Sequence, residues 1–219
     1  MDKLALLLQM VAWPTAQTAI MVLVPTFFAT LIGVPVGVIL ALWHPQGPYP
    51  HPGPYRLLDW LVNLLRSFPF LVLMILLFPL SRMIVGTTVG TVATLVPLSL
   101  AAAPLMARLA ESAFVSVERG MLEAALSCGA STGQLVRYVW LQECRAALIR
   151  AMTLTAVNLV GYSAMAGAVG GGGLGDLAIR WGVHRYRLDV LITAVVVIIL
   201  MVQVIQIVGE GLARWVSHE

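Results

Sequence analysis

Few side chains in this sequence could perform covalent chemistry, and they lie far apart along the chain. Ser163 and His184 are residue types that can form a nucleophile–base pair, as in an intramembrane protease. His184, however, precedes two arginines and a tyrosine at 185–187 in a predicted loop, which is a poor place for a buried base. An intramembrane enzyme is therefore the weaker alternative, and the sequence predicts no catalytic residue.

A glycine-rich stretch could bind phosphate if the residues after it completed a nucleotide-binding loop. The run from Gly170 to Gly175 is followed by Asp176 and Leu177, whereas a Walker loop requires Lys and then Ser or Thr. We therefore expect this chain to bind no nucleotide or other cofactor. Glycines also let helices approach closely, and Gly167 with Gly171 forms a GxxxG pattern that is typical of helix packing.

Candidate metal ligands are also sparse. His44 and His51 lie in the Pro- and Gly-rich stretch His44–Tyr55, which we predict to be a non-helical turn. Neither Cys nor a carboxylate accompanies them, so we interpret them as ordinary loop residues. The spacing of Cys128 and Cys144 does not suggest a metal site either. The sequence predicts no metal site.

Polar side chains interrupt one apolar stretch in a pattern that suggests a solute pathway. Asn158, Tyr162 and Ser163 could face a polar interior, because polar groups in lipid need partners. Met165 is flanked by small residues, and its flexible apolar side chain could close such a route by excluding water. Helix packing alone is the alternative explanation for this stretch.

The elements that must position these residues are membrane spans. The chain of 219 residues is 60% hydrophobic and 11% charged, against about 25% charged in soluble domains. Its mean hydropathy is +0.93, so lipid is its expected solvent. Four stretches without charged residues can each hold the ~20 apolar residues that a bilayer requires, at 4–55, 83–107, 151–175 and 190–209.

A fifth span is predicted at 57–80, with Asp59 and Arg66 placed near the membrane interface. Pro14 is expected to separate a short turn at Leu4–Trp13 from the first span. We thus predict an all-α membrane protein with a single domain, residues 1–219, and five transmembrane helices. The predicted spans are 18–43, 57–80, 88–107, 148–170 and 190–209.

An odd number of spans places the termini on opposite sides of the membrane. Seven Arg residues fall on the side of the C-terminus, against five Lys or Arg on the side of the N-terminus. The positive-inside rule then places the C-terminus in the cytoplasm and the N-terminus outside. The net charge of +3 is too small to suggest a nucleic-acid partner.

One hydrophilic segment, EAALSCGASTGQLVRYVWLQ at Glu123–Gln142, lies on the predicted cytoplasmic side. Apolar residues recur at helical spacing before and after a break at Gly129–Gly133, which predicts a short helix, a turn and a second helix. The apolar positions are Met121, Leu122, Ala125, Leu126, Leu135, Val136 and Val139. An outer face free to meet a partner would remain, although an ordinary helical hairpin has the same pattern.

This segment resembles the EAA loop of ABC-importer permeases, which forms the coupling helix that docks on the ATPase subunit. The loop is expected at 116–142. The family pattern ends in a proline, and this chain has Gln142 at that position. Further segments resemble the permease subunit of methionine ABC importers, in the same order along the chain. These are RSFPF at 66–70, IVGTTVG at 84–90, VPLSLAAAP at 96–104 and VGYSAMAGAVGGGGLG at 160–175.

The resemblance implies a type I ABC-importer permease of the bacterial inner membrane, which imports methionine or another small polar solute. Its partners would be a second copy, two cytoplasmic subunits that bind ATP and Mg²⁺, and an external substrate-binding protein or lipoprotein. An ion channel or secondary carrier remains a further alternative, although neither needs a docking helix. The implied coupling residues are Glu123, Ala124, Ala125, Gly129 and Ala130.

Overall fold

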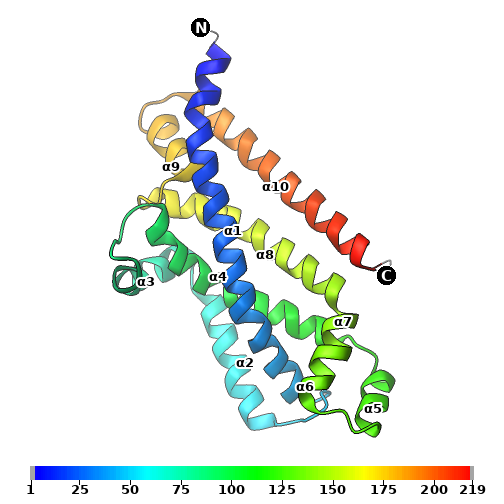
Figure 1. Cartoon of the computed structure of the whole chain (residues 1–219). Helices are drawn as coiled ribbons and strands as arrows, with labels where there is room; N and C mark the ends of the chain where they lie inside the picture. The colour runs from blue at the N-terminus through cyan, green and yellow to red at the C-terminus, as the bar shows by residue number, and fades with distance from the viewer. Residues whose placement is uncertain (1–2, 218–219) are drawn as a thin grey trace.

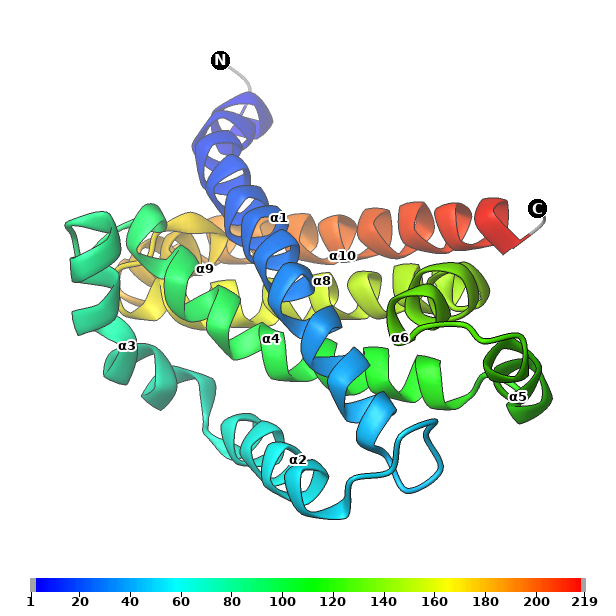
Figure 2. The same cartoon turned by 60° about the horizontal axis from the view of Figure 1, so that its bottom comes forward.

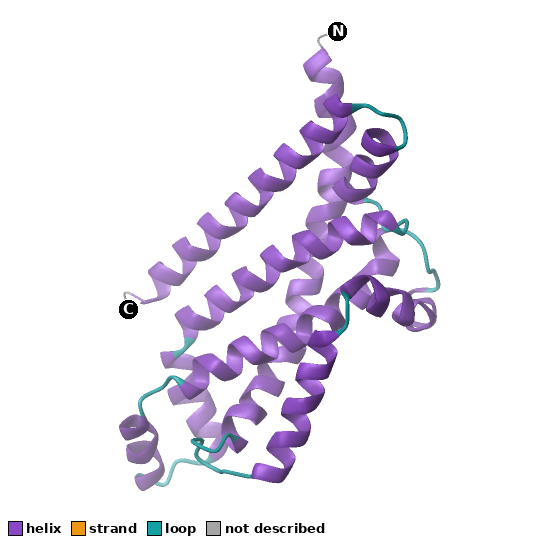
Figure 3. Ribbon diagram, turned by 180° about the vertical axis from the view of Figure 1, so that it is seen from behind, coloured by secondary structure: helices purple, strands orange, loops and turns teal. Residues whose placement is uncertain are grey.

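The computed structural model describes residues 3–217, which form helices and loops without a strand (Figure 3). This confirms the predicted all-α class. Figure 1 shows the arrangement of the helices and of the π-helical segments η1 and η2. They are α1 (Lys3–Trp43), α2 (Pro52–Ser67), α3 (Phe70–Val85), α4 (Thr91–Val115), α5 (Arg119–Ser127), α6 (Thr132–Gln134), η1 (Leu135–Trp140), α7 (Leu141–Glu143), α8 (Arg145–Ala168), α9 (Gly173–Leu177), η2 (Ala178–Val183) and α10 (Leu188–Ser217).

Within the described residues, α1, α4, α8 and α10 are each long and apolar enough to cross a membrane. The pair α2 and α3 would supply a fifth span if the two helices are counted together. The helix ends differ from the predicted spans, since α4 continues to Val115 and α10 to Ser217. The membrane boundaries themselves stay a prediction.

The predicted break at Pro14 is wrong, because α1 runs unbroken from Lys3 to Trp43 with Pro14 inside it. Proline removes one backbone hydrogen bond but does not forbid the helix when packing holds the residues on both sides. Leu7 and Val11, which precede Pro14, are buried in an apolar cluster with residues of α9 and α10. This packing keeps the first turns helical.

The predicted span at 57–80 is not a single helix, because it is divided into α2 and α3, whose axes differ by 104°. The break lies at Phe68 and Pro69, whose ψ angles of 132° and 128° are extended. Proline disfavours a helical conformation in the residue before it, so Phe68 ends α2. Pro69 then begins α3, where its missing N–H costs no helical hydrogen bond.

Asp59 does not extend freely to the interface, because it belongs to a polar network that joins α2 to α4. Arg108 Nη2 lies 2.5 Å from Asp59 Oδ1, and Arg108 Nη1 lies 2.6 Å from Glu111 Oε2. The hydroxyl of Tyr55 donates to Glu111 at 3.1 Å, and Arg108 also donates to Asn63 Oδ1 at 3.1 Å. Glu111 is buried, so the network satisfies charges that lipid would not.

The most extensive helix contact is between α1 and α4, and two glycines of α1 permit it. A Cβ atom on Gly33 would lie 2.8 Å from the carbonyl oxygen of Ala103, and one on Gly37 would lie 2.7 Å from that of Ala107. Figure 2 shows α1 passing over α4 at this crossing. Gly33 and Gly37 are therefore the GxxxG pair that joins two spans, and the sequence analysis did not identify it.

Gly167 lies where two helices pack closely, as its GxxxG pattern suggested, but Gly171 is not part of a helix. Gly171 lies in the turn beyond the end of α8, where a Cβ would meet the carbonyl of Ala166 at 2.8 Å. A Cβ on Gly167 would lie 2.7 Å from the carbonyl carbon of Gly175 in α9. These two glycines let the short helix α9, which follows α8 in the chain, fold back against the C-terminal end of α8.

Side chains of α1 cap the N-terminal end of α9. The backbone N–H of Gly173 donates to Gln17 Oε1 at 3.0 Å, and that of Leu174 donates to Thr18 Oγ1 at 2.9 Å. Gly172 and Gly173 both have φ of +79°, a conformation that favours glycine. The glycine run is thus a tight turn seated against α1.

The stretch His44–Tyr55 is less irregular than predicted, because α2 begins at Pro52. Proline is tolerated in the first turn of a helix, where its missing N–H has no helical partner. His44 Nδ1 accepts a hydrogen bond from the backbone N–H of Gln46 at 3.1 Å, and His51 Nδ1 lies 2.8 Å from the carbonyl oxygen of Tyr49. Both histidines therefore make local loop contacts.

Candidate coupling surface and translocation pathway

The segment around α5 forms the end of the molecule opposite the start of α1 (Figures 1 and 2). Leu122, Leu135 and Trp140 anchor it in an apolar cluster with residues of α1 and α4. The Trp140 ring stacks on Phe114 of α4 with ring centroids 5.2 Å apart. Movement of α5 would therefore be transmitted directly to the spans α1 and α4.

The predicted helix, turn and second helix are present in this segment, although Met121 is exposed and not part of the apolar face. Gly129 ends the first helix with φ of +78°, and a Cβ on it would have no heavy atom within 4 Å. Ser131 and Gln134 then form a reciprocal capping box that begins the next helix. Gly129 is thus required by backbone conformation and not by close packing within the chain.

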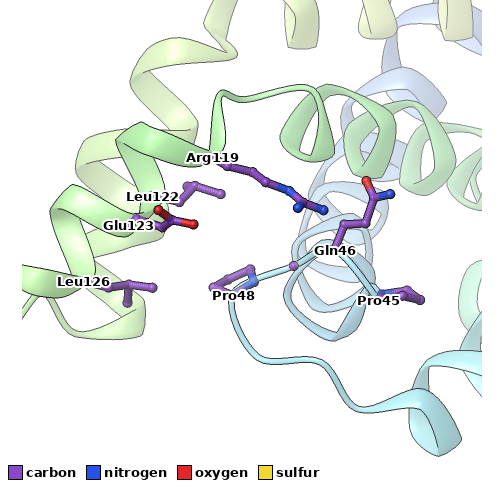
Figure 4. A pocket seen from close by; sticks show the side chains of 8 residues that line it. Pro45, Gln46, Pro48, Arg119, Leu122, Glu123 and Leu126 are labelled. Atoms are coloured by element: carbon purple, nitrogen blue, oxygen red, sulfur yellow. The ribbon is translucent and has the colours of Figure 1, made fainter.

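A groove of about 290 Å³ separates α5 from the turn that follows α1. Figure 4 shows Glu123 and Leu126 on one side of it, Pro48 on the other, and Arg119 extending towards Gln46. Among the described residues, no hydrogen bond or ion pair is formed by the side chains of Glu123 and Arg119. The groove therefore presents one acidic and one basic group that are available to a partner.

The remaining predicted coupling residues surround this groove or the turn after it. Ala124 is exposed, whereas Ala125 and Ala130 are half-buried. Gln142 is exposed in α7, and the helical segment ends one residue later, at Glu143. A glutamine here is compatible with the helix, which ends without the proline that the family pattern has at this position.

Cys144 follows α7 and is buried, and its thiol donates to the carbonyl oxygen of Ala113 at 3.2 Å. Burial raises the pKa of the Cys144 thiol to about 11, and the negative charge of Glu143 adds to the increase. Cys128, at the end of α5, is exposed. The two cysteines therefore differ sharply in their access to reagents.

Three of the predicted pathway residues lie on one side of α8. Asn158 and Met165 are exposed, the latter by 52%, and Tyr162 is half-buried between them along the helix. The Tyr162 ring stacks on Phe70 of α3, with centroids 4.5 Å apart and an interplanar angle of 2°. The amide nitrogen of Asn158 donates to the carbonyl oxygen of Leu154 at 2.9 Å. The amide oxygen of Asn158 takes no part in this hydrogen bond.

Ser163 does not share this side of α8, so its predicted place in the pathway is not supported by its position. The side chain is buried, and its hydroxyl donates to the carbonyl oxygen of Val160 at 2.7 Å. His184 is exposed just after η2, and the described residues show no hydrogen bond between the two. The arrangement lacks the Ser–His pair that an intramembrane enzyme would need.

A cavity of about 200 Å³ lies at the break between α2 and α3, and residues of α8 form one of its walls. Asn158 and Tyr162 line it, together with Arg66 at the end of α2. From its sequence position, Arg66 was expected near the membrane interface and not beside the predicted pathway residues. Its position two residues before a prolyl break was the available signal, because broken membrane helices often line solute sites.

Comparison with known proteins agrees with this architecture. Residues 33–219 match the family described as binding-protein-dependent transport system inner membrane component. The chain is 46% identical over 204 residues to the probable D-methionine transport system permease protein MetI of Vibrio cholerae, covering 93% of this chain and 91% of that protein. It is 42% identical over 210 residues to the corresponding protein of Pasteurella multocida, covering 96% and 97%.

A solved structure is also similar over nearly the whole length. A chain from an inward-facing structure of the MetNI methionine ABC transporter is 39% identical, with a TM-score of 0.92 and 99% of both chains covered. The alignment spans α2, α3 and the segment around α5. The chain belongs to the family of binding-protein-dependent transport system inner membrane components, the permease subunits of ABC transporters.

Proposed function

We propose that this chain forms the membrane pathway of an ATP-driven importer of methionine. The observation that carries the proposal is α5, an anchored helix with an accessible groove at one end of the bundle. The similarity to MetI proteins and to the MetNI transporter supports methionine as the solute. A bundle with four or five spans encloses little space, so two copies related by a twofold axis would share one pathway.

In this proposal α5 and the C-terminus face the cytoplasm, and the N-terminus faces outwards. Two separate subunits bind ATP and Mg²⁺, and each docks at the groove beside Glu123 of one permease copy. An external binding protein delivers the solute. When the ATP-binding subunits close, they move the two α5 helices. The cluster around Trp140 passes this movement to α1 and α4, so that the bundles rock between inward- and outward-facing states.

The proposal is tested by reconstituting the permease with its ATPase and binding protein in proteoliposomes and measuring ATP-dependent uptake of radiolabelled methionine. Glu123→Lys reverses the charge at the groove and should lower uptake at least tenfold without preventing membrane insertion. Glu143→Lys makes the same change on exposed α7, outside the groove, and should leave uptake within twofold of wild type. Absence of methionine uptake by the wild-type complex would contradict the proposal.

The orientation is tested separately with a membrane-impermeant maleimide on the exposed thiol of Cys128. Cys128 should remain unlabelled in intact cells and become labelled in inverted membrane vesicles. Labelling in intact cells would place α5 outside, where cytoplasmic ATPase subunits could not reach it.

A further inference from the structure

We propose that the cavity at the break between α2 and α3 binds the carboxylate of the transported amino acid during its passage. The Arg66 guanidinium and the N-terminal end of α3 would hold the carboxylate, and an apolar wall would receive the side chain. This inference rests on the proposed function and adds a specific solute site to it.

Arg66 is a cation that lacks a partner inside its own bundle. It lines the cavity, and among residues 3–217 it forms neither an ion pair nor a side-chain hydrogen bond. Arg66 and Asn158 are both exposed within their own chain. Both side chains are therefore open to a solute at this cavity, where the unpaired guanidinium can bind a carboxylate.

The N-terminal end of α3 is a second positive element at the same cavity. Pro69 is its N-cap residue, and the end has no side-chain cap. Phe68 and Phe70, on either side of Pro69, both line the cavity. Free N–H groups and the helix dipole favour negative charge, and transporters commonly direct the ends of broken helices at anionic groups of their solutes.

The other walls match the rest of an amino acid with an apolar side chain. Leu73 and Leu105 form the apolar wall beside Phe70, and none of the described residues that line the cavity is acidic. The free amide oxygen of Asn158 can accept a hydrogen bond from the solute ammonium group. The volume of about 200 Å³ is below the ~300–1,000 Å³ of sites for drug-sized ligands and suits a small solute.

The test measures methionine molecules imported per ATP hydrolysed by the complete complex in proteoliposomes. Arg66→Gln should lower this ratio at least tenfold while ATP hydrolysis and copurification of the ATPase stay normal. Arg66→Lys keeps the positive charge and should stay within threefold of wild type. Leu105→Trp should lower the ratio by filling the cavity without changing its charge.

Arg56→Gln is the matched control, because it removes the same charge from the same helix at a position that does not line the cavity. It should leave the ratio within twofold of wild type. A ratio within twofold for Arg66→Gln, or an equal defect in Arg66→Lys, would overturn the carboxylate site while the proposed function stands. A wild-type complex that imports no methionine would refute the proposed function and this inference with it.

Discussion

At the scale of single residues, Gly129 determines how α5 is presented. Its φ of +78° lies in the left-handed region, while the space around a Cβ would be empty. The conformation of the turn, and not crowding within the chain, therefore requires glycine here. Substitutions at Gly129 can therefore separate the effect of backbone strain from the effect of a steric clash with a partner.

We expect Gly129→Leu to lower ATP-coupled methionine uptake about tenfold, because a left-handed conformation costs a branched residue roughly 1–2 kcal/mol. Gly129→Asn should keep most of the uptake, since asparagine tolerates this region. Gly133→Ala is the control, as Gly133 lies in a helix with no heavy atom near its Cβ position. Normal uptake by Gly129→Leu in proteoliposomes would remove Gly129 from the coupling role.

The raised pKa of Cys144, about 11, predicts a steep pH dependence of its alkylation. Thiolate is the reactive form, so at pH 8 only about one thiol in a thousand would be ionised. Iodoacetamide should modify exposed Cys128 first, and the rate at Cys144 should rise about tenfold per pH unit until the pH approaches 11. Mass spectrometry of the purified permease measures both rates, and unfolding should abolish the difference.

At the scale of elements, the turn from α8 into α9 depends on contacts at backbone distance. Gly167 and Gly175 bring α9 against the end of α8, and Gln17 and Thr18 of α1 cap α9. These contacts hold the C-terminal end of α8 in one position. Side chains larger than hydrogen at the glycines would separate the two helices.

Gly167→Ala should therefore destabilise the permease by about 1–3 kcal/mol, because its methyl group would overlap the backbone of α9. Gly161→Ala lies on the same helix with open space at its Cβ position, and it should be neutral or stabilising. Thermal unfolding of the two variants in detergent measures the difference. Equal melting temperatures would show that α9 is not packed on Gly167.

At the scale of the whole molecule, one side of α8 is only partly covered by the other described residues of its own chain. Asn158 and Met165 lie there, and in the proposed assembly this side would meet its counterpart in a second copy. Two Met165 side chains could then close the pathway by excluding water while remaining able to move aside. In this proposal the role of Met165 would arise in the assembled pair and not in the single chain.

Met165→Ala should increase passive leak of small solutes several-fold in proteoliposomes that hold the assembled complex. The melting temperature should change little, because Met165 is 52% exposed within its own chain. Met152→Ala provides a comparison on the same helix, away from the proposed gate. An unchanged leak together with normal uptake would make Met165 an ordinary packing residue.

Composition and the spacing of charges were sufficient to predict an all-α membrane protein, because lipid cannot solvate charged groups or free backbone groups. The periodicity of 116–142 likewise predicted a helix, a turn at Gly129 and a second helix, since turn chemistry is local. The resemblance of the EAA segment and of RSFPF also correctly identified the family.

Tertiary packing decided what local patterns left open. Pro14 stays helical because Leu7 and Val11 are buried against α9 and α10, whereas Pro69 divides a span because α3 turns towards α8. The helix-joining GxxxG pair is Gly33 and Gly37, since only the crossing of α1 over α4 determines which glycines meet a backbone. Arg66 lies beside the predicted pathway residues Asn158 and Tyr162 for the same reason, because only the fold brings α2 and α8 to one cavity.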